Sequence, residues 1–161
     1  SIDYVHNGGT QIALVADSVP GYSGWIAGYS VGVENQPGDD PDKDGIENLL
    51  EFVLNGDPTA SDGSILPTMS VTATNFEFTW QRRDDSVAPE TTQTFEWGTT
   101  LATWPGSAEV PETSGSVGEA TITVSAGLPD NAVTDTVKVS IPKTEAGGAG
   151  RLFGRLQVTK P

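Results

Sequence analysis

The 161-residue chain has no cysteine, a single histidine and only eight basic residues. Without cysteine there is no disulfide framework, no thiolate metal site and no cysteine nucleophile. A zinc site made of His and Cys ligands is excluded for the same reason. A Ser-His-Asp triad would have to use His6, which lies beside a Gly-Gly turn signal, a poor place for a pre-organised base. A phosphate-binding glycine loop followed by Lys and a helix is also missing. We therefore expect that the protein is not an enzyme.

Acidic residues, in contrast, are abundant: 22 Asp and Glu against 8 Lys and Arg give a formal net charge of −14. Such a surface repels phosphate backbones and anionic membranes, so we expect no nucleic-acid partner. The sequence contains no run of 18 apolar residues, so we expect no membrane insertion. A strongly acidic chain attracts cations, and above all Ca²⁺.

The composition favours strands and turns, because Thr and Gly are frequent and charged residues make up only 19%. This is typical of an exported protein, and we expect an extracellular or cell-surface location for a secreted bacterial protein. The chain begins with Ser, which indicates a mature product or a piece of something longer.

Sequence patterns divide the chain into four stretches. Residues 1–17 read as an N-terminal segment of two strands around Asn7-Gly8-Gly9. Residues 18–58 hold an aromatic stretch, an acidic loop and a helix, and residues 59–67 are a linker. A lone hairpin is marginal in water, so the first segment needs a sheet to join.

From residue 68 to 161, apolar residues recur at every second position in runs separated by turns, for example at Phe76, Phe78 and Trp80. Six or seven such strands, each with one apolar face, predict a mainly β protein. The predicted fold is an antiparallel two-sheet β-sandwich of the immunoglobulin or fibronectin III type. Trp80 and Trp97 lie on the apolar faces, and we expect both in the core.

The acidic loop carries the most specific pattern. Counted from Asp40, the loop has carboxylates at positions 1, 3 and 5, a Gly at 6, a backbone carbonyl at 7, an amide at 9 and a carboxylate at 12. This is the spacing of an EF-hand-type calcium loop, because Ca²⁺ takes six to eight oxygen ligands and alternate residues of a tight loop point inward. The predicted ligands are Asp40, Asp42, Asp44, the carbonyl of Ile46, Asn48 and Glu51. The alternative is a solvated acidic turn that caps the following helix.

The helix that precedes the loop in a full EF-hand is missing, because residues 32–38 contain Gly and Pro. The loop therefore resembles those of dockerins and thrombospondin type 3 repeats. A single site of this kind is more typical of a structural role than of a sensor. We expect the ion to hold the predicted helix, residues 46–55, and the linker onto the sandwich.

The segment "DPDKDGIENLLEFVLNGDP", within residues 25–58, resembles a module found at the C-terminal end of large secreted proteins of Verrucomicrobia and Planctomycetes. The segments "FEFTWQRRDDS", "TFEWGTTLATW", "DTVKVSIP" and "RLFGRLQV" fit that module in order. Residues 1–16 are similar to the last strand pair of autotransporter-associated β-strand repeats. The resemblance implies location and architecture, and it brings no catalytic residues.

Two functions of different classes follow. The first is a non-enzymatic, calcium-binding extracellular module for surface display or assembly. In this function, residues 1–17 pair with another copy or a neighbouring domain, as in a filament built by strand addition, or they fold back onto their own domain. The second is a carbohydrate-binding module that stacks a polysaccharide on Trp25, Trp104 or Tyr22. The alternative for Trp25 and Trp104 is that they pack against the sandwich.

Overall fold

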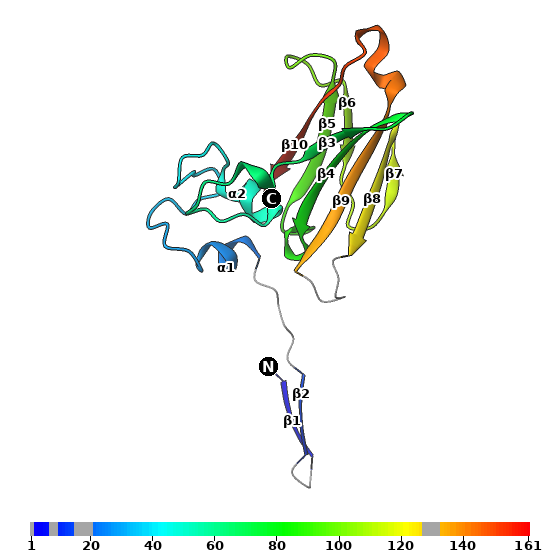
Figure 1. Cartoon of the computed structure of the whole chain (residues 1–161). Helices are drawn as coiled ribbons and strands as arrows, with labels where there is room; N and C mark the ends of the chain where they lie inside the picture. The colour runs from blue at the N-terminus through cyan, green and yellow to red at the C-terminus, as the bar shows by residue number, and fades with distance from the viewer. Residues whose placement is uncertain (1, 7–9, 15–20, 127–132) are drawn as a thin grey trace.

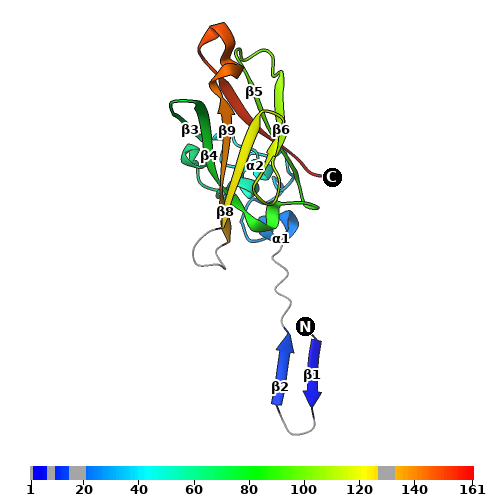
Figure 2. The ribbon, with the colours of Figure 1, turned by 90° about the vertical axis from the view of Figure 1, so that its right-hand side faces the viewer.

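A computed structural model describes residues 21–126 and 133–161 in full, together with the strands at 2–6 and 10–14 (Figure 1). Residues 68–161 form two antiparallel sheets that lie face to face, as Figures 1 and 2 show from two sides. The larger sheet has the order β3 (Thr68–Val71), β4 (Asn75–Arg83), β9 (Thr134–Pro142), β8 (Ala120–Ala126) and β7 (Gly115–Val117). The smaller sheet has the order β10 (Phe153–Thr159), β5 (Thr92–Gly98) and β6 (Gly106–Glu109). The predicted mainly β sandwich is confirmed.

The core lies between the sheets and follows from the alternation along each strand. In β4, Phe76, Phe78 and Trp80 are buried, and the residues between them are half-buried. These three rings stand opposite Ile141, Val139 and Val137 of β9, all fully buried. Trp97 of β5 is buried from the other sheet, as expected. One apolar face per strand is what a two-layer packing requires.

In residues 68–126 and 133–161 the sandwich has eight strands, more than the six or seven predicted. The two strands absent from the prediction are β6 and β7, which have four and three residues and little apolar alternation. A short 3-10 turn, η1 (Gly63–Ile65), precedes β3, and two others, η2 (Asp84–Ser86) and η3 (Lys143–Ala149), follow β4 and β9. Strands as short as β6 and β7 have too few positions for a period of two to be recognised in the sequence.

A helical lobe precedes the sandwich and consists of α1 (Tyr22–Ile26) and α2 (Asn48–Leu54) with the loops around them (Figure 1). Rings of Tyr22 and Trp25 lie 5.7 Å and 5.4 Å from the ring of Phe52, which joins α1 to α2. Leu54 belongs to the sandwich core, and the guanidinium of Arg83 on β4 lies over the Phe52 ring. The lobe is thus anchored to β4 by apolar and cation–π contacts.

Helix α2 is shorter than the predicted 46–55. At its start, the backbone N–H groups of Asn48 and Leu49 donate to the carbonyls of Asp39 and Pro37, so the acidic loop itself caps the helix. At its end, Asn55 adopts a left-handed conformation with φ 59°, and the N–H groups of Asn55 and Gly56 donate to the carbonyl of Glu51.

Strands β1 (Ile2–His6) and β2 (Thr10–Leu14) pair with each other in a two-stranded antiparallel sheet. In the described residues, no ladder joins this hairpin to either larger sheet. The turn signal at Asn7-Gly8-Gly9 lies outside the described residues. No described helix has the length and apolar character needed to cross a membrane.

Candidate metal centre

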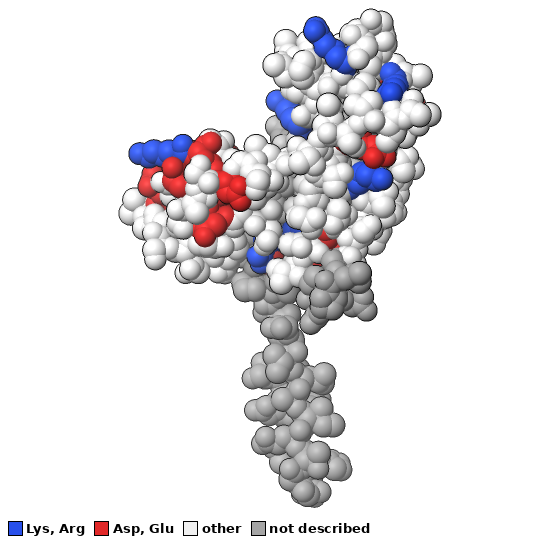
Figure 3. All heavy atoms as spheres, viewed as in Figure 1, with Lys and Arg blue, Asp and Glu red and all other residues white. Residues whose placement is uncertain are grey.

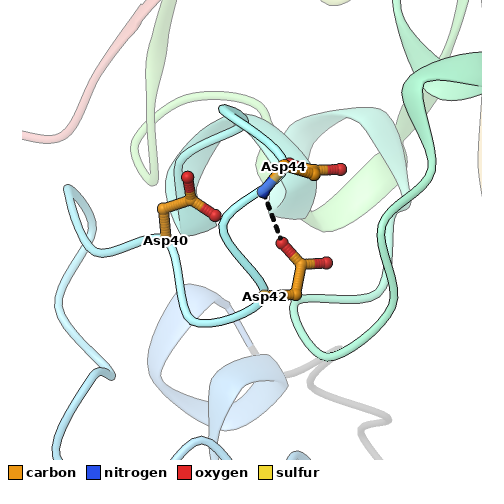
Figure 4. A group of neighbouring side chains, drawn as sticks. All are labelled: Asp40, Asp42 and Asp44. Carbon is orange, nitrogen blue, oxygen red and sulfur yellow. Dashed lines mark hydrogen bonds between the residues drawn. The ribbon is translucent and has the colours of Figure 1, made fainter.

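The three aspartates of the acidic loop converge. Asp40, Asp42 and Asp44 each offer a carboxylate oxygen, and these oxygens lie within 4.8 Å of one another (Figure 4). Oxygens bound to one Ca²⁺ at 2.3–2.6 Å can be separated by up to about 5.2 Å, twice the longest bond. The spacing of the aspartates therefore fits a single calcium coordination sphere.

Backbone conformation and backbone hydrogen bonds close this loop into a tight turn. Lys43 and Gly45 have positive φ values of 63° and 91°, and at Gly45 the absence of a side chain permits the sharp turn. The N–H groups of Lys43 and Gly45 donate to the two oxygens of Asp40. Figure 4 shows a further bond, from the Asp44 N–H to Asp42 Oδ1, at 3.1 Å. These hydrogen bonds orient the aspartate carboxylates on one tight turn.

Asn48 and Glu51, the other two predicted side-chain ligands, lie on helix α2 and are not among the three carboxylates that converge. Their side chains are 0% and 1% exposed. Asn48 Nδ2 donates to the carbonyls of Glu34 and Gln36, whereas its Oδ1 has no hydrogen-bond partner. Glu51 Oε2 and Asp42 Oδ2 are also buried without a partner. Buried oxygen atoms are nearly always bonded to a hydrogen-bond donor, a water or a metal ion, so these three oxygens are free to accept such a partner.

The pKa of Glu51 is raised by its surroundings. Burial, and then the negative charges of Asp42, Asp44, Asp57 and Asp40, raise the pKa of Glu51 to about 8. Burial also raises the pKa of Asp42 above its ordinary value. A carboxylate held among other carboxylates stays neutral unless a cation compensates its charge. A positive charge near Glu51 would favour its ionised form.

The linker closes over the loop, which the sequence did not indicate. The backbone N–H of Asp62 donates to Asp44 Oδ2 at 3.0 Å, and Asp62 itself caps the 3-10 turn η1 through Ser64. Asp57, just after α2, also contributes to the raised pKa of Glu51 through its negative charge. The only signal for either residue was the acidic character of residues 57–62, which also suits an ordinary loop.

Acidic side chains gather on the lobe that carries this loop, at the left in Figure 3. The predicted ligands Asp40, Asp42, Asp44, Asn48 and Glu51 are thus gathered in one lobe. Ile46, whose carbonyl is the predicted ligand at position 7, is buried in the same loop.

The three rings predicted as sugar platforms lie in different surroundings. Tyr22 and Trp25 are 4% and 7% exposed in the cluster between α1 and α2, which is the packed alternative. Neither offers an open ring face. Trp104 is half-buried, and the guanidinium of Arg155 lies 4.7 Å from its ring centre. Arg155 also pairs with Glu96 on β5, so this cation is fixed in place.

Comparison of the chain with protein-family models, with curated proteins and with solved structures finds no match. The fold and the site define a β-sandwich with a helical lobe that carries an acidic loop in which three aspartate carboxylates converge.

Proposed function

We propose that the protein is a calcium-braced structural module of a secreted or cell-surface protein, for display or assembly and not for catalysis. The observation that carries the proposal is Glu51: a carboxylate that is 1% exposed, has an unpartnered oxygen and faces four aspartates. Calcium supplies the missing charge and takes hard oxygen ligands in irregular geometry. The proposed ligands are Asp40, Asp42, Asp44, the Ile46 carbonyl, Asn48 and Glu51.

A bound ion braces three parts of the chain at once. The aspartates belong to the loop, Asn48 and Glu51 to α2, and the linker reaches Asp44 through the Asp62 N–H. Helix α2 is joined to β4 through Leu54 and through the contact of Arg83 with the Phe52 ring, so an ordered loop holds the lobe in place beside the sandwich. An ion that binds only the folded state adds its free energy of binding to the free energy of unfolding.

Calorimetric titration with Ca²⁺, together with thermal unfolding with Ca²⁺ and with chelator, tests the proposal. The wild-type chain should bind one ion and unfold at a higher temperature with Ca²⁺. Asp42→Asn should lose both effects. Glu119→Gln removes the same charge from an exposed turn and should keep both. No heat of binding and equal unfolding temperatures in wild type would exclude the proposal.

The alternative, a carbohydrate-binding module, now depends on Trp104, since Tyr22 and Trp25 are buried. It is tested by retention on insoluble polysaccharides and by a glycan panel. Retention that is lost in Trp104→Ala would favour it, and no binding across the panel would rule it out.

A further inference from the structure

The two layers of the sandwich are unequal, and the difference lies at one edge. In the immunoglobulin order, one sheet reads A-B-E-D and the other G-F-C. Strands β3, β4, β9 and β8 take the A, B, E and D places, and β10 and β5 take the F and C places. In the described residues no strand lies beside β10 in the place of G, so β10 forms an open edge.

The inner face of the larger sheet is uncovered at the corresponding position. Met69 and Val71 of β3 pair with Phe78 and Phe76, so they share the core-facing side with these buried rings. Nevertheless Met69 is 54% exposed and Val71 is 53% exposed. Two apolar residues on a core-facing side that stay half in solvent show that the opposite layer ends too early.

Gly154 fixes how far the smaller sheet reaches. A Cβ atom at Gly154 would lie only 2.9 Å from the Phe78 ring, so β10 lies directly over β4. The next place in that layer, opposite β3, is the place of the missing strand.

At the other half of β10 the edge faces a groove. This groove has a volume of about 340 Å³ and lies between Leu156–Val158 and the start of α2. Its walls include Leu49 and Leu50 of α2, with Gly45 and Glu47 from the end of the acidic loop. We call this the β10 edge groove, defined by Leu49, Leu50, Leu156, Gln157 and Val158. An extended strand beside β10 would have Met69 and Val71 at one end and this groove at the other.

Apart from the lobe of α1 and α2, which packs against Leu156 and Val158, the β10 edge lacks the usual protection against strand addition. Natural edge strands are short, charged, bulged or interrupted by Pro. Strand β10 has seven residues without Pro, and its one charge, Arg155, is paired with Glu96. The edge strands β6 and β7 have only four and three residues.

The chain contains a matching strand. Strand β2 belongs to a sheet of only two strands, a unit that is marginal in water. Residues 7–16 carry no charge, whereas the chain as a whole carries −14 and Glu47 lines the groove. A charged strand would be repelled there, and this uncharged one is not. Ile12 and Leu14 alternate with Gln11 and Ala13 in the sequence, the pattern of a strand with one apolar face.

Chain length favours pairing between copies over pairing within one copy. Helix α1 begins at the C-terminal end of β10, because the amine of Lys160 lies over the Tyr22 ring and Glu90 bonds both residues. A strand antiparallel to β10 would end near Phe153, roughly 20 Å away along a seven-residue strand. The seven residues 15–21 span at most about 23–25 Å, so they would have to run straight back along the edge. A second copy meets no such constraint.

We propose that the open edge of β10 accepts strand β2 of a second copy, as the missing strand of the smaller sheet. Main-chain hydrogen bonds to β10 provide affinity, and Ile12 and Leu14 cover Met69, Val71 and the β10 edge groove. Donor and acceptor are different surfaces, so the contact does not close on itself and copies add in a row. This inference rests on the assembly part of the proposed function and not on its calcium part.

Because the chain has no native Cys, disulfide mapping gives a direct test. Gln11→Cys is mixed under added oxidant with Arg155→Cys, Gln157→Cys or Thr159→Cys, the exposed outer positions of β10. Neighbouring strands place such pairs close enough for a disulfide. At least one mixture should give a covalent heterodimer. The matched control is Thr121→Cys, equally exposed but on β8, an inner strand of the other sheet, which should not react.

Light scattering of the full chain at high concentration provides the second readout. Ile12→Lys with Leu14→Lys should abolish higher-mass species. Val33→Lys with Leu101→Lys, two apolar residues 91% and 70% exposed, adds the same charge elsewhere and should leave them intact. A monomeric wild type, or heterodimer yields no greater than the Thr121→Cys control, would overturn the inference. Calcium titration of the same samples separates the two ideas: bound calcium without association contradicts only this inference, and absent calcium binding contradicts the proposed function.

Discussion

Two fully buried ionisable side chains, one in the sandwich and one in the helical lobe, are treated in opposite ways. Arg82 of β4 is 0% exposed, but its terminal nitrogens donate to the carbonyls of Pro111 and Glu112 and to Asp135, and only its Nε is left without a partner. Glu51 of α2 is 1% exposed, and the charged groups that raise its pKa are all aspartates. The sandwich compensates its buried charge internally, whereas in the described residues no basic side chain pairs with Glu51. Burial of a charge therefore indicates a binding site only where the protein supplies no partner.

Replacing Arg82 gives the largest expected effect on this comparison. Arg82→Ala leaves Asp135 and two carbonyls unpaired and opens a cavity between the sheets. Breaking a buried ion pair in this way costs about 3–5 kcal/mol. Urea unfolding should show this loss equally with Ca²⁺ and with chelator. A loss seen only with Ca²⁺ would contradict the separation of the two regions.

Glu51→Gln should give the reverse dependence. With Ca²⁺ at a hundred times its Kd, ion binding contributes about 2.7 kcal/mol to the free energy of unfolding, and the variant should lose most of it. In chelator the variant should be at least as stable as wild type, because an amide stays neutral among the aspartates without the proton that Glu51 must take up on folding. Glu47→Gln, which removes an exposed charge at a non-ligand position of the same loop, is the control. Equal losses with and without Ca²⁺ would show that Glu51 acts only as a packing residue.

Features of the fold and site could be predicted from sequence where the residues that form them lie close together in the chain. The spacing from Asp40 to Glu51 lies within twelve residues, so the grouping of the loop residues could be predicted from sequence; its occupancy by calcium stays a prediction. The alternation in β4 and β9 likewise predicted the sandwich. The partners of Arg82 lie 29, 30 and 53 residues away in the chain, and no local pattern announces them. The missing strand beside β10 is a property of strand order, which alternation does not encode.

Amide hydrogen exchange should locate the brace within the chain. Removal of Ca²⁺ should speed exchange in residues 57–65, where the Asp62 N–H depends on Asp44, and in the loop 40–46. Central strands β4 and β9 should keep their protection, because their ladder does not include the site. Uniform acceleration across both regions would mean that the ion stabilises the whole fold instead of the lobe.

The smallest expected effect is the release of a proton when calcium binds. Without the ion, burial and the surrounding aspartates raise the pKa of Glu51 to about 8, against an ordinary value of 4.5. A carboxyl group with a raised pKa in the folded state holds its proton there and loses it on unfolding, so metal-free stability should fall as the pH rises from about 4.5 to about 8. Calcium binds only the ionised carboxylate, and binding at pH 7 should therefore release close to one proton, whereas well above pH 8 it should release almost none. Calorimetric titration in two buffers of different ionisation enthalpy measures this release directly. Binding heats at pH 7 that do not depend on the buffer would show that Glu51 is already ionised in the metal-free protein, and that the lobe, like the sandwich, compensates its buried charge by itself.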